Sequence, residues 1–159
     1  MASLTYTGPG TVEFVSNPNP SEYRVRINTP GLYAVTVQVI DDEGKGYTDI
    51  VTVQVTDFAA LDLLLRAKWN GLRDALGASN IPKALEYIAQ GAKNMYQFNF
   101  ELMNAYLGEI AAGLQDISIV KVRDQRAEFE MWAEEDGQMY SFYILFSKDR
   151  DGIWRISFF

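Results

Sequence analysis

The amino-acid composition of this 159-residue chain changes abruptly near Asp57. All eight threonines and nine of the eleven valines lie within residues 1–57, whereas eleven of the thirteen leucines and all three tryptophans come after Phe58. Threonine and valine have stiff, branched side chains that favour strands, while leucine favours helices. The chain is therefore expected to form two modules with different secondary structure, residues 1–57 and 58–159.

The first module is predicted to be all β. Apolar and polar side chains alternate over 33–40 and again over 51–56, which is the period of half-buried antiparallel strands. The polar segment 41–46 between them contains two glycines, which suit a tight turn. Shorter strands are predicted at 11–16 and 23–27, separated by a break at 17–20 that contains two prolines.

The second module is predicted to be α+β. A helix from Phe58 to about Leu76 carries a stripe of apolar residues at steps of three and four. A second helix is expected between Asn80 and Gly91, and a third helical region, broken near Asn99 or Gly108, over 92–114. The period then changes to two, which predicts an antiparallel meander. Its strands are expected at 117–123, 126–134, 138–147 and 153–158.

Charge and missing residue types exclude several kinds of function. The net charge is −7, spread over both modules, so a phosphate backbone would be repelled and no nucleic acid is expected as a partner. The sequence contains no Cys and no His, which removes thiolate nucleophiles, imidazole bases and the usual zinc ligands. The acidic run 41–43 lacks the spacing of a calcium loop, so neither a metal nor a cofactor is expected. No apolar run is long enough to span a membrane.

A motif in the first module is typical of a known class of domains. The run PGLYAVTVQVID at 30–41 is followed by a V-x-V-x-V run at 51–55. Over residues 29–55 this arrangement resembles the late hairpin of bacterial Ig-like and PKD-type β-sandwich modules. The resemblance implies a sandwich of antiparallel strands. Because 57 residues are few for a whole sandwich, it implies a truncated or reduced one.

Motifs in the second module carry another resemblance. They are Trp69 and Leu72 in the first helix, the A-L-x-Y run at 84–87, and the F-x-K…D-G-x-W-R-I run over 146–156. Residues 58–159 thus resemble the NTF2-like (cystatin-like, SnoaL-type) superfamily. The resemblance implies helices packed on a curved four-stranded antiparallel sheet, forming a cone with a pocket at its open end. The superfamily contains enzymes as well as members that only bind or oligomerise. No acidic residue here matches a catalytic position of the family, so no catalytic residue is assigned.

Seven aromatic residues are candidates to line such a pocket and to bind a small apolar ligand. Tyr87 and Tyr96 are the strongest of them, because each hydroxyl needs a partner when it is buried. Ordinary core packing against the first helix explains the same residues and is the interpretation that we favour. The candidates are Trp69, Tyr87, Tyr96, Phe98, Phe129, Phe142 and Trp154.

A second set of apolar residues is predicted to face away from the helices. The period of two puts Trp132, Met139, Tyr143 and Leu145 on the outer face of the sheet. The same pattern puts Trp154, Ile156 and Phe158 together on one face of the last strand, packed toward the helices. An outer face this apolar is expected to be covered by another chain, through self-association or a protein partner, or by residues 1–57.

These inferences define the expected function. The resemblances imply a non-catalytic, extracytoplasmic module of a larger bacterial surface or secreted protein. The β part would be a spacer and the NTF2-like part an interaction or assembly domain. The alternative is a small-molecule-binding or enzymatic domain that uses the cone pocket, and the contents of the cone interior distinguish the two.

Overall fold

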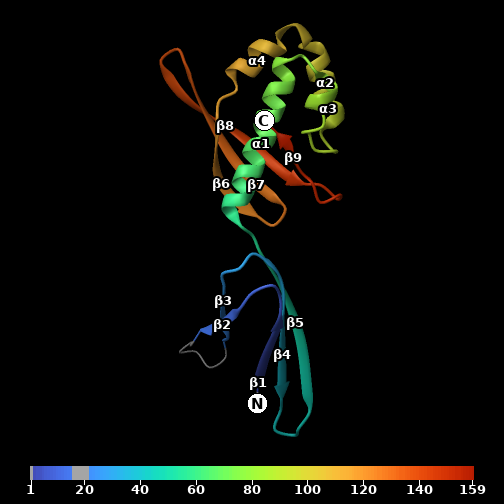
Figure 1. Cartoon of the computed structure of the whole chain (residues 1–159), viewed down its shortest axis with the longest axis vertical. Coiled ribbons are helices and arrows are strands. Elements are labelled where there is room, and N and C mark those ends of the chain that lie inside the picture. The colour runs from blue at the N-terminus through green and yellow to red at the C-terminus, as the bar shows by residue number, and fades with distance from the viewer. Residues whose placement is uncertain (1, 16–21) are drawn as a thin grey trace. The chain divides into compact units, whose positions relative to one another are not determined.

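The computed structural model describes residues 2–15 and 22–159, and the predicted break at 17–20 lies outside this described part (Figure 1). The chain divides into two compact units, Met1–Phe58 and Ala59–Phe159. The first unit contains antiparallel sheets, and the second combines helices with one four-stranded antiparallel sheet. The fold class is therefore mixed α+β, as predicted.

The first unit contains two antiparallel sheets. One has the order β1–β4–β5 and the other pairs β2 with β3. The register aligns Tyr33 with Val53 and Val35 with Val51, so the predicted alternation places these side chains on one face. The strands are β1 (Ala2–Thr7), β2 (Val12–Val15), β3 (Arg24–Ile27), β4 (Gly31–Ile40) and β5 (Gly46–Val55).

The first unit has a small core centred on Tyr33. This side chain is fully buried, and its hydroxyl donates a hydrogen bond to the carbonyl oxygen of Thr29 at 2.9 Å. A side chain at Gly8 would collide with the Tyr33 ring, so glycine is needed there for the loop to cover the ring. Half-burial was predicted for both long strands, but β5 is almost entirely exposed. The strands of this unit are therefore paired along much of their length without being buried by a core.

The second unit begins with a long helix and ends with a meander. Its sheet has the order β6–β7–β8–β9, with every neighbouring pair antiparallel, which confirms the predicted four-stranded sheet. The elements are α1 (Phe58–Gly77), α2 (Ile81–Ala84), α3 (Lys93–Leu102), a 3₁₀ turn (Asn104–Tyr106), α4 (Leu107–Gly113), β6 (Ile117–Arg123), β7 (Arg126–Glu135), β8 (Gln138–Lys148) and β9 (Trp154–Phe158).

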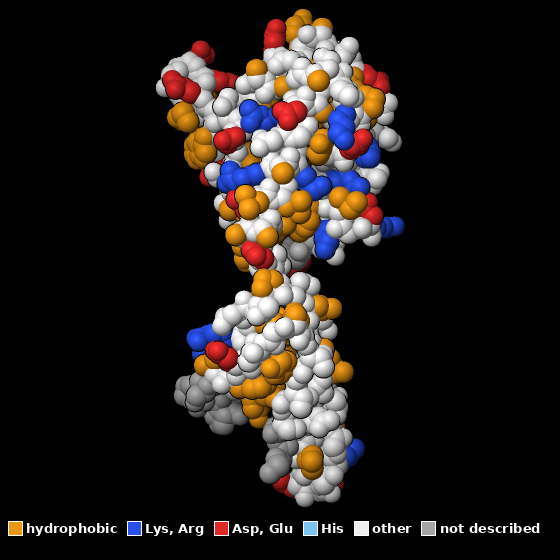
Figure 2. Space-filling model, viewed as in Figure 1, with side chains coloured by type: hydrophobic (Ala, Val, Ile, Leu, Met, Phe, Trp, Pro, Cys, Tyr) orange, Lys and Arg blue, Asp and Glu red, His pale blue; other side chains and the backbone are white. Residues whose placement is uncertain are grey.

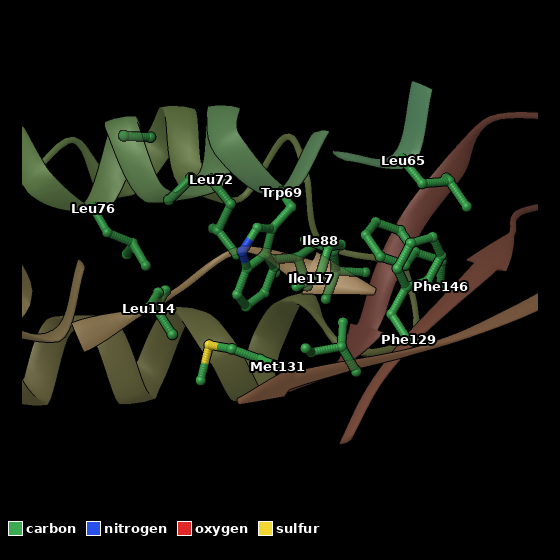
Figure 3. Close-up of a cluster of buried hydrophobic side chains, with 14 of the residues drawn as sticks. Leu65, Trp69, Leu72, Leu76, Ile88, Leu114, Ile117, Phe129, Met131 and Phe146 are labelled. Atoms are coloured by element: carbon green, nitrogen blue, oxygen red, sulfur yellow. The ribbon is translucent and has the colours of Figure 1, made fainter. Parts of the chain in front are cut away.

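The apolar stripe of α1 packs on the inner face of this sheet. Leu65, Trp69 and Leu72 are at most 1% exposed and point from α1 toward the side chains of the strands (Figure 3). Phe129 of β7 and Phe146 of β8 are equally buried, and their rings meet edge to face with centroids 5.3 Å apart. Because both surfaces are apolar and closely packed, this contact forms the main core of the unit.

The helix predicted between Asn80 and Gly91 is much shorter than expected. Asn80 caps it as predicted, since its side-chain oxygen accepts from the Lys83 amide at 3.1 Å, but α2 ends at Ala84. The following residues pair with the last strand instead. The Ile156 amide donates to the Tyr87 carbonyl and the Ala89 amide donates to the Ile156 carbonyl, both at 2.8 Å. These bonds use main-chain groups that a longer helix would need, so the helix stops.

The third helical region is interrupted, but at neither predicted position. α3 ends at Leu102, and a 3₁₀ turn at Asn104–Tyr106 precedes α4. Asn99 lies within α3 and Gly108 within α4. Phe100 of α3 and Leu107 of α4, one before and one after the interruption, both belong to the core.

Removing side-chain volume from the α1 stripe should destabilise the second unit strongly. We expect Leu72→Ala to lower the free energy of unfolding by about 2–5 kcal/mol, since it leaves a cavity in a packed core. Leu63→Ala, in the same helix but at a position that is 70% exposed, should change it by less than about 0.5 kcal/mol. Urea unfolding followed by tryptophan fluorescence measures both, and equal effects would contradict the assigned core.

Candidate functional site

Three of the predicted pocket residues lie together in the interior of the second unit. Trp69, Tyr96 and Phe129 are each 5% exposed or less. The indole nitrogen of Trp69 donates to the carbonyl oxygen of Gln115 at 2.8 Å, so its polar atom is satisfied within the protein. Such burial is expected of core residues as well as of residues that line an enclosed pocket. The two cases differ in what lies between the rings.

Phe159 lies between two of these rings, those of Trp69 and Tyr96. Its ring stacks parallel to Tyr96 with centroids 5.0 Å apart and meets Trp69 edge to face at 5.6 Å. The Tyr96 hydroxyl accepts from the Phe159 amide at 2.9 Å and donates to the Phe159 carbonyl at 3.3 Å. Burial raises the pKa of this phenol above its usual value. The Tyr96 hydroxyl, which was expected to need a partner when buried, thus finds that partner in the main chain of Phe159.

The remaining pocket candidates divide into two groups. Tyr87 and Trp154 are half-buried and pack against the same core, and a side chain at Gly71 would collide with the Tyr87 ring. Phe98 and Phe142 are 65% and 40% exposed, so for these two the predicted place in a pocket is wrong.

Each of the two errors has a physical cause. The buried face of α3 is formed by Tyr96 and Phe100, and Phe98 lies between them in sequence on the exposed face. Phe142 shares the inner strand face with Ile144 and Phe146, but it belongs to the part of the β7–β8 hairpin that extends beyond the helices (Figure 1).

Two of the surface hollows of the second unit lie away from the aromatic set, and a third touches it at Trp69. One lies between α1 and α4 over Arg73 and Asp116, and another lies beside the turn at 149–151. Trp69 borders a third, with a volume of about 100 Å³, together with Arg66 and Asn70. Neither Tyr96 nor Phe129 lines any of these three hollows.

A cluster of charges fastens the β8–β9 turn to the segment after α2. The Arg155 guanidinium lies 2.9 Å from an Asp149 carboxylate oxygen and 2.8 Å from one of Asp151. The Gln90 amide donates to Asp149 at 3.1 Å. A hydrogen bond from the Ile153 amide and the adjacent guanidinium lower the pKa of Asp151. Because these carboxylates are already satisfied by donors of the protein, the cluster has a structural role.

The four predicted interface residues all lie on the outer face of the sheet. Trp132, Met139 and Tyr143 are 47%, 59% and 46% exposed, and Leu145 is half-buried. The register pairs Trp132 with Ser141 and Glu130 with Tyr143, which places these residues on the face opposite Phe129 and Ile144.

Phe158 joins this face, contrary to the prediction that it would share a face with Trp154 and Ile156. The pairing of β8 with β9 shifts between Leu145 and Phe146, which sets Phe158 opposite Leu145. Its ring lies 6.1 Å from that of Tyr143 and is 52% exposed. The place of Phe158 on the outer face could not be predicted, because the sequence carries no signal for the register shift. We call the exposed set the outer-face patch: Trp132, Met139, Tyr143, Leu145 and Phe158.

Charges of opposite sign border the outer-face patch at its two ends. Arg123 and Arg126 are register partners on this face, beside the β6–β7 turn. Glu134, Glu135 and Asp136 lie at the opposite end, where β7 turns into β8. Desolvation and the nearby Glu128 carboxylate raise the pKa of the Tyr143 phenol. The face is therefore basic at one end and acidic at the other. Between these ends, apolar side chains lie beside Glu128 and Glu130, the register partners of Leu145 and Tyr143.

Compared with models of known protein families, with curated proteins and with solved structures, the chain matches none of them. In the described part of the chain, no helix is long and apolar enough to cross a membrane. The described residues also contain no group of three or more acidic side chains arranged to hold a metal ion.

Removing the Tyr96 hydroxyl should test whether it holds Phe159 in the core. We expect Tyr96→Phe to lower the free energy of unfolding by about 1–3 kcal/mol, because the partly buried Phe159 amide loses its acceptor. Tyr106→Phe removes a hydroxyl from a side chain that is 61% exposed and serves as the control. Thermal unfolding measures both, and an unchanged stability of the Tyr96 variant would show that the bond contributes nothing.

Proposed function

We propose that this chain is a non-catalytic module of a larger extracytoplasmic bacterial protein, in which the first unit is a spacer and the second an interaction or assembly domain. The Ig/PKD-like motif at 30–55 supports the spacer role, together with the two small antiparallel sheets of the first unit. The NTF2-like motifs support the second assignment, together with helices packed on a four-stranded antiparallel sheet. The proposed location rests on these resemblances.

The observation that carries the proposal is the outer-face patch. Three aromatic rings, those of Trp132, Tyr143 and Phe158, are about half exposed on one sheet face. Aromatic side chains and methionine are enriched where proteins bind one another, and a gathered apolar patch is uncommon on a surface that only faces water. On the opposite face, Ala127, Phe129, Ile144 and Phe146 are packed into the core and are not available to a partner.

The charges around the outer-face patch favour a second copy of this chain as the partner. A two-fold axis that lies between the two sheets, parallel to their planes and perpendicular to the strands, would set two such faces against each other with their strands antiparallel. The basic end, at Arg123 and Arg126, would then face the acidic end of the other copy, at Glu134 and Asp136. Between these ends the apolar side chains of the two patches would meet, so the face is complementary to itself in hydrophobicity and in the charges of its two ends.

The alternative function, a small-molecule site inside the cone, is less well supported. An apolar ligand there would have to displace Phe159 from between Trp69 and Tyr96, and break the bond from the Phe159 amide to the Tyr96 hydroxyl. An enzyme would also need a proton-transfer group in that space. The chain has no His, and no Asp or Glu of the described residues is buried.

Charged substitutions in the outer-face patch should dissociate the assembly. We expect the intact chain to sediment as a dimer, and Trp132→Asp and Phe158→Asp each to weaken the dimer about tenfold or more, since a hot-spot ring is replaced by a charge. Phe98→Asp alters an equally exposed ring on α3 and should leave the dimer intact. Analytical ultracentrifugation measures all four proteins. A monomer at every concentration, or dissociation by Phe98→Asp as well, would contradict the proposal.

A further inference from the structure

The end of the β7–β8 hairpin is a two-stranded arm. The strand β6 pairs with β7 only as far as Met131, and β9 pairs with β8 only as far as Leu145. Over the remaining residues, β7 and β8 pair with each other alone, from Trp132 with Ser141 to Glu135 with Gln138. We call residues 132–143 the arm. Within the described chain, neither of its two edges has a neighbouring strand.

The arm projects from the sheet beyond the helices (Figure 1). Each of its residues is exposed except Ala133, which is half-buried. Apolar side chains occupy both faces, with Tyr140 and Phe142 on one and Met139 and Tyr143 on the other. A two-stranded ribbon is marginally stable in water by itself, and a third strand is the usual way to stabilise it.

The edge of β8 along the arm is unusual in lacking the features that keep strand edges from pairing. The opposite edge of the sheet, β6, carries Lys121 and Arg123 and an irregular pairing after Ile119, all of which hinder strand addition. The arm's β7 edge is short and carries Glu134 and Glu135. The β8 edge over 138–144 has no charged residue and no proline, and its pairing with β7 continues without a shift.

We infer that this β8 edge, residues 138–144, accepts an extended, lysine- or arginine-bearing segment of another protein as an added strand. The inference rests on the proposed function in making the second unit an interaction domain, but it uses the strand edge rather than the outer-face patch. Main-chain hydrogen bonds to 138–144 would provide the affinity. Alternate side chains of the added strand would lie beside the exposed rings on the two faces of the arm.

Charge selects the kind of segment. From Ala127 to Ser147 the sequence has five acidic residues and no Lys, Arg or His, so this stretch carries a charge of −5. Figure 2 shows acidic side chains gathered at the tip of the arm, above hydrophobic ones. A second copy of the arm would bring the same negative charge to the same edge and be repelled. A basic segment would be attracted, and its cations would lie over the faces of Tyr140 or Tyr143.

A pair of peptides separates strand addition from simple charge attraction. The probe is an acetylated, amidated octapeptide of alternating Lys and Val, and the control is the same peptide with N-methylated valines, which keeps the charge but removes the donors needed for a ladder. Hydrogen exchange of the full chain, followed by NMR, reads the main-chain amides of 138–144. The probe should slow exchange of the edge-facing amides at least tenfold, and the methylated peptide should not.

Two matched variants test the role of charge. The double variant Glu134→Gln with Glu135→Gln should weaken binding of the Lys-Val peptide about threefold or more at low salt. The double variant Asp42→Asn with Glu43→Gln removes the same charge from an exposed turn of the first unit and should bind like the parent chain.

Several outcomes overturn the inference. The first is that the methylated peptide protects the amides of 138–144 as well as the Lys-Val peptide does, and the second is that the Lys-Val peptide gives no protection. The third is that these amides become protected in the chain alone as its concentration rises, which would make a second copy the occupant of the edge. Sedimentation of the same samples keeps the two proposals distinct. If the Lys-Val peptide protects the amides of 138–144 while the chain sediments as a monomer, the added strand is supported and the proposed dimer is contradicted. If the chain sediments as a dimer and the peptide gives no protection, the dimer is supported and the added strand is contradicted.

Discussion

The packing of α1 on the inner face of the four-stranded sheet is the contact on which the second unit depends. Leu65, Trp69 and Leu72 point from the helix toward Phe129 and Phe146, and burial of these apolar side chains stabilises the unit. Because successive strand residues point to opposite faces, fixing one face against α1 also fixes which residues lie on the other. The outer-face patch is thus a consequence of how the core is built.

The same packing determines what the interior can do. Phe159 lies between Trp69 and Tyr96, and its main-chain amide bonds to the Tyr96 hydroxyl, so aromatic rings and a satisfied polar group occupy the place where a ligand would lie. The proposed interactions instead use two features outside this ring stack, the exposed aromatic rings of the outer-face patch and the free strand edge of the arm. Both lie on the sheet, which makes the sheet the basis of the proposed interactions.

Much of this architecture is predictable from the sequence, because it depends on local periodicity. The steps of three and four from Leu61 to Leu76 predict α1, and the period of two predicts the four strands of the sheet. The errors arise where pairing between distant residues decides. The strand β1 forms on the edge of β4 and was not predicted, α2 ends early because Tyr87 and Ala89 pair with Ile156, and a register shift turns Phe158 outward. Phe98 and Phe142 were misplaced because periodicity does not show how far the helices cover the sheet.

The central claim, that the interior of the second unit is filled, is tested most directly by adding benzene to the isotope-labelled chain and following its NMR spectrum. Benzene enters apolar cavities large enough to hold it and leaves packed cores unchanged. We expect the resonances of Trp69, Tyr96 and Phe129 to stay in place up to saturating benzene. Saturable shifts confined to these three residues would reveal a chamber among the rings and contradict the account.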